Sequence, residues 1–178
     1  FTTDIKQNPD NTVDYVVDVF DFDYNKLPFY PDFIWASPPC TYFSVASIGK
    51  HWNKDHTPKS KEALLGLKII EKTKEIINEL KPHYFIIENP RGKLRKLKIL
   101  NEYKLDTVTY CQYGENRMKP TDLWHNLDWK PRPMCKNGMP CHEQAPRGSK
   151  TGTQGMANAY EKSKVPSELC KEILMSVA

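Results

Sequence analysis

Two residues that can do covalent chemistry stand at the ends of apolar segments of this sequence. Cys40 comes shortly after the apolar segment 32–36, and Glu88 ends the apolar segment 83–88. A cysteine thiolate is a nucleophile, and a carboxyl group in apolar surroundings can hold a proton near neutral pH because burial raises its pKa. Each residue alone also fits a structural role, Cys40 as a small buried side chain and Glu88 as a loop-capping acid. As a pair, they predict a nucleophile beside a proton donor.

Hydrophobic periodicity predicts the strands that must position this pair. Runs rich in apolar and β-branched residues predict strands at 13–19, 32–36, 83–88 and 105–112. Prolines 38 and 39 end the second of these, since proline has no N–H for a strand ladder.

Two helices complete the predicted fold. Apolar residues at helical spacing predict a long amphipathic helix at 59–80, which Pro82 ends, and a last helix at 167–177. Strands that alternate with helices predict an α/β fold with a parallel sheet and crossover helices. Because ligands bind beyond the carboxyl ends of parallel strands, Cys40 and Glu88 are expected together at one sheet edge.

The order of motifs resembles that of the DNA (cytosine-5) methyltransferase family. Pro-Pro-Cys at 38–40 is followed by Phe-Ser at 43–44, and Glu-Asn-Pro at 88–90 comes after a helix and a strand. Residues 113–119 (Tyr-Gly-Glu-Asn-Arg-Met-Lys) stand where the family has Tyr-Gly and then Gln-x-Arg-x-Arg. The resemblance covers residues 32–121.

This resemblance implies a Rossmann-like fold, S-adenosylmethionine as methyl donor, and a cytosine of double-stranded DNA flipped out of the stack as the substrate. Cys40 would attack C6 of the base, Glu88 would act as the acid at N3, and Arg117 would orient the base. Lys119 takes the place of the second arginine, without the planar two-point contact of a guanidinium. Further substrate and DNA contacts are expected from Ser44, Asn89, Arg91, Lys93 and Arg95.

The resemblance also implies a cofactor site near the start of the chain. Its expected contacts are Asp4, Asp18, Pro38 and Asn158. The sequence departs from the family here, because no Phe-x-Gly-x-Gly cofactor loop is present. That loop and the first strand are expected either before Phe1 or not at all, and the second case would make the chain an inactive relative. Another departure is Thr41, where the family usually has glutamine.

Segment 128–155 is rich in Pro, Gly, Lys and Cys and shows no periodicity. It is expected to be a loop-rich insert that replaces a target-recognition domain, between a catalytic core at 1–127 and closing helices at 156–178. Soft metal ligands cluster in and near it, and the predicted zinc ligands are Cys135, Cys141, His142 and His125. The alternative is a proline-rich loop with two free thiols.

Composition narrows the class of protein. The 178 residues carry a net charge of +4, which permits a polyanionic partner without requiring one. The mean hydropathy is −0.66, and no apolar run approaches the roughly 18–20 residues of a membrane span, which argues against an integral membrane protein. The five widely spaced cysteines favour a reducing, cytoplasmic location over a disulfide framework.

Four functional hypotheses follow. The first is a compact DNA cytosine-5 methyltransferase of a virus, phage or mobile element, of the restriction-modification kind. The second is an inactive relative that binds DNA or a protein partner. The third, an amino-methyltransferase, is disfavoured because Cys40 stands where those enzymes have an aromatic residue after Pro-Pro. The fourth, a metal-binding structural module, explains only residues 135–142.

Overall fold

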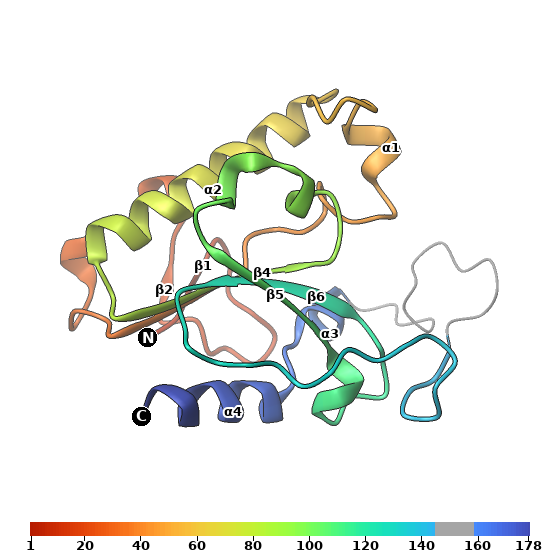
Figure 1. Ribbon diagram of the computed structural model, residues 1–178. Coiled ribbons are helices and arrows are strands. Elements are labelled where there is room, and N and C mark those ends of the chain that lie inside the picture. Colours follow the sequence, from red (N-terminus) through yellow and green to blue (C-terminus); the bar gives the residue numbers. More distant parts are fainter. Residues whose placement is uncertain (145–158) are drawn as a thin grey trace.

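The computed structural model of the chain describes residues 1–144 and 159–178. A four-stranded sheet lies between a long helix, α2 (Lys61–Leu80), and a C-terminal helix, α4 (Ser167–Val177), as Figure 1 shows. The strands, in order across the sheet, are β3 (Phe33–Ala36), β4 (Tyr84–Pro90), β6 (Pro120–His125) and β5 (Lys104–Thr109). Two short helices complete the fold, α1 (Ile48–His51) and α3 (Ala159–Ser163).

The sheet is mixed, so the predicted parallel sheet is wrong in one strand. β3 and β4 are parallel, with Ala36 opposite Ile87. β6, which the sequence analysis did not predict, is antiparallel to both β4 and β5. The predicted strand 105–112 ends at Thr109, where a 3₁₀ turn, η5 (Tyr110–Tyr113), begins. The connection at 110–119 is shorter than the dozen or so residues that a parallel crossover needs, so β6 returns antiparallel.

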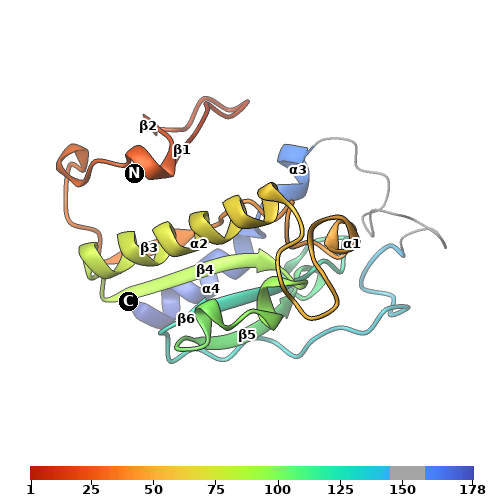
Figure 2. The same cartoon turned by 90° about the horizontal axis from the view of Figure 1, so that it is seen from above.

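The first residues of the chain form a separate two-stranded sheet (Figure 2). β1 (Thr3–Asp4) and β2 (Tyr15–Val16) pair in parallel. The predicted strand 13–19 shortens to β2 because the Asp18 side chain accepts a hydrogen bond from the backbone N–H of Phe20 at 3.0 Å. This bond caps a 3₁₀ turn, η1 (Val19–Asp21), which lies against α2.

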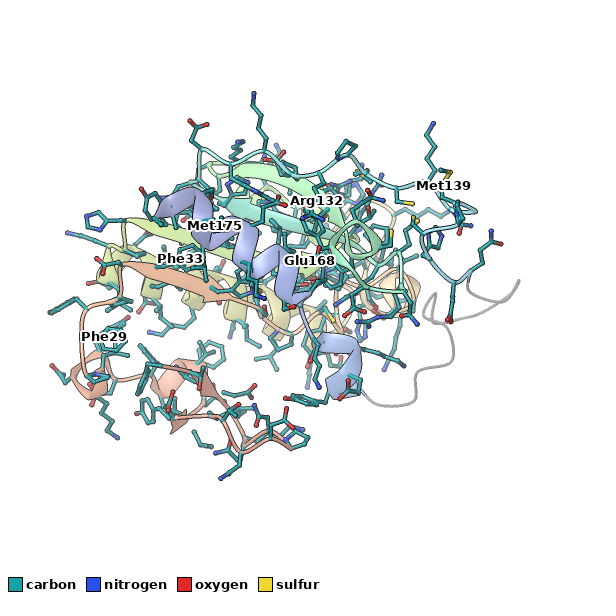
Figure 3. The ribbon with its side chains drawn as sticks, turned by 90° about the horizontal axis from the view of Figure 1, so that it is seen from below. Phe29, Phe33, Arg132, Met139, Glu168 and Met175 are labelled. Carbon is teal, nitrogen blue, oxygen red and sulfur yellow. The ribbon has the colours of Figure 1, made fainter. Side chains whose placement is uncertain are left out.

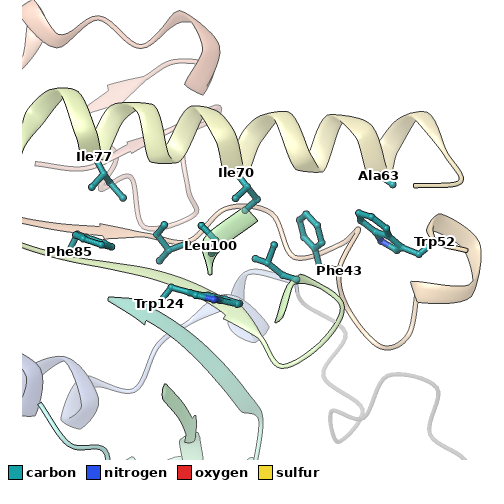
Figure 4. Close-up of a cluster of buried hydrophobic side chains, with 10 residues drawn as sticks. Phe43, Trp52, Ala63, Ile70, Ile77, Phe85, Leu100 and Trp124 are labelled. Atoms are coloured by element: carbon teal, nitrogen blue, oxygen red, sulfur yellow. The ribbon is translucent and has the colours of Figure 1, made fainter. Parts of the chain in front are cut away.

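Helix α2 confirms the predicted helix and covers one face of the sheet. Its N-cap, Ser60, accepts a hydrogen bond from the N–H of Ala63 at 3.1 Å, and Lys81 ends the helix in the left-handed region. The buried residues of the helix are Ala63, Gly66, Ile70, Thr73, Ile77 and Leu80. Figure 4 shows Ile70 and Ile77 above Phe85 and Trp124 of the sheet.

The opposite face of the sheet packs against α4, which has the predicted bounds 167–177. Side chains alternate along a strand, so Ile86 and Leu123 point to this face, where Leu169 and Ile173 cover them. Both faces of the central strands are therefore buried, and polar groups at their ends have little access to water. Across residues 1–144 and 159–178, none of the helices is both long and apolar enough to cross a bilayer.

Candidate functional site

Cys40 and Glu88 lie at the same edge of the sheet, as the sequence predicted. β3 ends at Ala36, opposite Ile87, while β4 continues through Glu88 to Pro90, paired only with β6. The chain that leaves β3 toward Cys40 therefore starts beside the last residues of β4, which include Glu88. Asn89 Nδ2 donates a buried hydrogen bond to the carbonyl oxygen of Pro38 at 3.0 Å. This bond ties the Pro-Pro-Cys turn directly to the Glu-Asn-Pro motif.

A tight turn holds Cys40 at this edge. The Cys40 carbonyl oxygen accepts hydrogen bonds from the N–H groups of Phe43 and Ser44, at 3.0 and 2.9 Å. Phe43 is fully buried under α2, and its carbonyl oxygen accepts a hydrogen bond from the N–H of Lys93 at 2.7 Å. Gly92 makes this approach feasible, because a Cβ there would lie 2.3 Å from the Phe43 oxygen. The nucleophile turn is therefore anchored to both α2 and the segment after β4.

Glu88 is a buried acid, with 5% of its surface exposed. Its Oε1 accepts a hydrogen bond from the Tyr110 hydroxyl at 3.2 Å. Burial raises the pKa of Glu88 above its ordinary value, while the Lys119 charge and this hydrogen bond lower it. Burial also raises the pKa of Tyr110 well above its ordinary value, so Tyr110 stays a hydrogen-bond donor. The net rise favours the protonated form of Glu88.

Cys40 is half-buried, and its thiol is the resting form. Burial first, and then the Glu88 charge, raise the pKa of Cys40, whereas the nearby Lys119 charge lowers it. The effect of the Glu88 charge on the pKa of Cys40 shows that the two groups lie close to each other. The raised pKa values of both groups favour a neutral thiol beside a neutral carboxyl group.

Lys119 lies between the groups of this site. Its ammonium stands over the Tyr110 ring at 4.5 Å and donates a hydrogen bond to the carbonyl oxygen of Lys162 at 2.9 Å. Burial lowers the pKa of Lys119, while the charges of Glu88 and Cys40 raise it. The residue also has a backbone φ of +25°, a region that L-residues rarely occupy. Its central position was not predicted, because the sequence showed only a substitution for arginine.

Arg117 is buried, with 3% of its surface exposed, and lies near enough to Lys119 for its charge to lower the pKa of that lysine. Its Nε and Nη2 donate to the Glu115 carboxylate at 3.0 and 2.9 Å. Its Nη1 is buried without a hydrogen-bond partner among the described residues. Because a buried guanidinium donor is costly to leave unpaired, this atom is available for a ligand.

The basic run after Glu-Asn-Pro is only partly exposed. Arg91 is exposed, as predicted. Lys93, however, is buried: it donates to His56 Nδ1 at 2.7 Å and stands over the Trp52 ring at 5.3 Å. Arg95 pairs with the buried carboxylate of Asp122 at 2.8 Å. The prediction that Lys93 and Arg95 are free for DNA contacts is therefore corrected, because both have partners within the protein.

A groove nevertheless runs along this segment, beside the loop that follows Cys40. Its basic lining residues are His56, Arg91, Lys93, Arg95 and Lys96. Ser44 lies nearby, and its hydroxyl is hydrogen-bonded to that of Ser47 at 3.0 Å. Asn89, predicted as a substrate contact, has no exposed surface, so the hydrogen bond to Pro38 is its role in this structure.

The expected cofactor residues lie in or shortly after strands of two separate sheets. Asp4 is exposed on β1, and Asp18 caps η1 after β2. Pro38 is buried beside Cys40, and Asn158 lies outside the described residues. Asp4 accepts one long hydrogen bond, at 3.4 Å from the N–H of Lys6, so it has acceptor capacity for the hydroxyl groups of a ligand. The carboxylates of Asp4 and Asp18 are hydrogen-bond acceptors, and the hydroxyl and amino groups of a nucleoside are donors that match them.

The predicted metal ligands need one correction. Cys135, Cys141 and His142 come together, but the fourth member of their cluster is Cys111 and not His125. His125 Nε2 is hydrogen-bonded to Asp106 at 3.1 Å, and its Nδ1 accepts from the N–H of Leu127. Its ring is thus occupied inside the sheet, away from the cluster.

Comparisons with known proteins identify the family of the chain. Residues 6–109 match the family described as C-5 cytosine-specific DNA methylase. A Frog virus 3 (isolate Goorha) protein, assigned as a DNA (cytosine-5)-methyltransferase, is 36% identical over 122 residues, which are 65% of this chain and 56% of the viral protein. This chain thus spans little more than half of that relative.

A crystal structure was also found, of an E. coli prophage-encoded protein assigned as a DNA modification methyltransferase. It matches 80% of this chain and 49% of its own, at 16% identity and a TM-score of 0.49. The family match alone covers more than half of the chain. The chain belongs to the family of C-5 cytosine-specific DNA methylases.

Proposed function

We propose that this chain carries the catalytic centre of a DNA (cytosine-5)-methyltransferase, with Cys40 as the nucleophile. The observation that carries the proposal is the pairing of Cys40 with a buried acid, Glu88, across the β3–β4 edge of a chain of this family. A carbon nucleophile must be created at C5 of cytosine, which is otherwise unreactive. Addition of a thiolate to C6 creates one, and this pair supplies both the thiolate and the acid.

In the proposed reaction, the Cys40 thiol loses its proton to solvent, and the resulting thiolate sulfur forms a bond to C6 and pushes the C5–C6 π-electron pair toward C5. Glu88 donates its proton to N3, which takes up the negative charge that builds on the ring. After C5 is methylated, the C5 proton is lost to a base. The electron pair of the broken C5–H bond then expels the sulfur from C6, and N3 gives its proton back to Glu88. The aromatic ring, the Cys40 thiolate and the protonated acid are thereby restored.

Three further side chains support this pair. The Nη1 of Arg117, buried without a partner among the described residues, would donate to the cytosine. Lys119 would favour the Cys40 thiolate by its positive charge, a role that does not need the planar geometry of arginine. Tyr110 would hold the Glu88 carboxyl in place by its hydrogen bond.

The methyl donor of this reaction would be S-adenosylmethionine, as the family implies. When bound, it supplies an electrophilic methyl group to C5. Asp4 and Asp18 would accept hydrogen bonds from its nucleoside part, and Pro38 would line the site beside Cys40. Asn158 would close the site.

The substrate would be double-stranded DNA with the target cytosine flipped out of the stack. The basic groove next to the Cys40 turn offers the exposed cations Arg91 and Lys96 to the phosphates. We place the reaction in the cytoplasm, where a reactive thiol stays reduced.

The proposal is tested by transfer of a labelled methyl group from S-adenosylmethionine to DNA, followed by digestion to nucleosides. The label should appear in 5-methylcytosine for the wild-type chain and for Cys170→Ser, and be lost in Cys40→Ser. Wild-type chain that binds DNA without labelling it would instead support the inactive relative. Label in the exocyclic amino group of adenine or cytosine would overturn the reaction class.

A further inference from the structure

A second cluster of reactive side chains lies outside the catalytic site, where the insert meets the sheet. The sulfur atoms of Cys111, Cys135 and Cys141 and a ring nitrogen of His142 all lie within 4.8 Å of one another. They come from different parts of the chain. Cys111 is buried in η5, directly after Tyr110, and the other three belong to the insert. Three thiols and one imidazole are a common ligand set for structural zinc.

The separations fit a shared metal ion better than a covalent bond. His142 Nδ1 is 3.6 Å from the sulfur of Cys135 and 3.6 Å from that of Cys141. Ligand bonds of about 2.3 Å to sulfur and about 2.0 Å to nitrogen, in a tetrahedron, place such atoms roughly 3.5 Å apart. The Cys135 and Cys141 sulfurs are 3.2 Å apart, much longer than the roughly 2.05 Å of a disulfide.

Backbone hydrogen bonds hold the ligands in place on both sides of the cluster. The N–H of Cys135 donates to Thr109 Oγ1 at 2.9 Å, where β5 ends. The N–H of Glu143 donates to the carbonyl oxygen of Asn116 at 2.8 Å, next to Arg117. The cluster is thus built between the insert and the segment that presents Arg117.

The described part of the insert has little apolar burial of its own beyond residue 129. Figure 3 shows Arg132 beside Glu168 of α4, with the chain then running away from the helix toward Met139. Met134 and Met139 are exposed, at 44% and 50%. A segment without a core needs another source of stability, and a structural metal ion provides one.

We propose that Cys111, Cys135, Cys141 and His142 bind one zinc ion, which fastens the insert to η5 beside Arg117. The site is structural: all four coordination positions are filled by protein, so no position remains for substrate or water. The zinc ion would stabilise an insert that is too short to form a hydrophobic core of its own. This inference does not depend on the proposed methyl transfer.

The test is the zinc content of the purified chain, expressed in medium supplemented with zinc and measured by elemental mass spectrometry. We expect one zinc per chain in the wild type and a loss of most of it in Cys111→Ser. Cys170→Ser, which changes a cysteine on α4, should keep its zinc, and so should His125→Gln. Cobalt added to the metal-free chain should give the visible absorption of a tetrahedral thiolate site.

Other results would overturn the proposal. A folded wild-type chain without bound zinc would overturn it. In such a chain, either all five thiols react with a thiol reagent, or Cys135 and Cys141 form a disulfide. Zinc retained in full by Cys111→Ser would also overturn the proposal. Because the wild-type content decides the first point, a variant that fails to fold does not obscure the answer.

Discussion

The side-chain amide of Asn89 donates a hydrogen bond of 3.0 Å to the carbonyl oxygen of Pro38, and Asn89 has no exposed surface. The bond links the residue after Glu88 to the turn that ends in Cys40. It therefore fixes the proposed nucleophile relative to the proposed acid, although neither residue takes part in it.

Asn89→Ala should thus impair both stability and reactivity. Loss of a buried hydrogen bond that leaves an oxygen unpaired costs about 1–3 kcal/mol of unfolding free energy. A less firmly held Cys40 should also lower the rate of covalent capture of cytosine, by roughly tenfold or more. Urea unfolding and capture kinetics measure the two effects. Asn78→Ala, an exposed asparagine on α2, is the matched control. Unchanged values for Asn89→Ala would show that the bond positions nothing.

Gly92 should tolerate no side chain. A Cβ would lie 2.3 Å from the carbonyl oxygen of Phe43, so Gly92→Ala must push apart the nucleophile turn and the segment after β4. We expect a loss of about 1–3 kcal/mol in urea unfolding. At Gly49 nothing lies within 4 Å of an added Cβ, so Gly49→Ala should be near neutral. Equal effects of the two substitutions would contradict the close approach.

Lys119 should make the Cys40 thiol more acidic. A positive charge favours the thiolate, so Lys119→Met should raise the pKa of Cys40 further above its ordinary value. At a given pH, less thiolate then forms, and alkylation of Cys40 by iodoacetamide slows. Mass spectrometry of the Cys40 peptide over a pH series reports the change. Lys119→Arg keeps the charge and should restore most of the rate, while Lys130→Met, at an exposed lysine, should match the wild type. A pH profile of Lys119→Met that overlays the wild type would remove Lys119 from this role.

Glu88 should make the chain less stable as pH rises. Its folded-state pKa is raised, so the folded chain holds a proton that the unfolded chain loses at lower pH. By linkage, the unfolding free energy falls as pH rises from the unfolded pKa to the folded pKa, by at most about 1.4 kcal/mol for each pH unit between these two pKa values. The titratable groups that face Glu88 are Tyr110, Lys119 and Cys40, and the Ser37 hydroxyl is a further hydrogen-bond partner.

Glu88→Gln removes this proton and should flatten that part of the pH dependence. Asp122 also has a raised pKa and contributes with the same sign, so the difference between variant and wild type isolates Glu88. Urea unfolding over a pH series that starts at the ordinary pKa of a glutamate and extends upward measures it. The same variant should slow covalent capture by about 10²–10⁴-fold, because an amide cannot donate the proton. Parallel pH curves would contradict a raised pKa.

The sheet edge could be predicted because its signals are local. Prolines 38 and 39 mark the end of one predicted strand, and the motif Glu-Asn-Pro marks the end of the other, although β4 ends at Pro90 and not at Glu88 as predicted. Parallel strands then bring these ends to the same side of the sheet. The antiparallel strand β6 carries no such signal, since its pattern follows directly on the Arg117 motif. Because β6 was not predicted, Arg95 was expected to contact DNA, whereas it pairs with Asp122 on that strand.

The metal cluster shows the same limit. His125 lies nearer than Cys111 in sequence to Cys135 and Cys141, so proximity along the chain favoured it. The structure places His125 inside the sheet against Asp106, while η5 turns Cys111 toward the insert. Which cysteine joins the cluster depends on where β5 ends, and the sequence predicted that strand three residues too long.

The most direct test of the proposed chemistry is covalent capture on double-stranded DNA that contains 5-fluorocytosine, with S-adenosylmethionine present. Fluorine at C5 cannot leave as a cation, so the reaction stops with the sulfur still bonded to C6. We expect an adduct that survives denaturation, that maps to the Cys40 peptide by mass spectrometry, and that disappears in Cys40→Ala. An adduct at another cysteine, or the absence of an adduct from a folded chain that binds both DNA and S-adenosylmethionine, would contradict the assignment of Cys40 as the nucleophile.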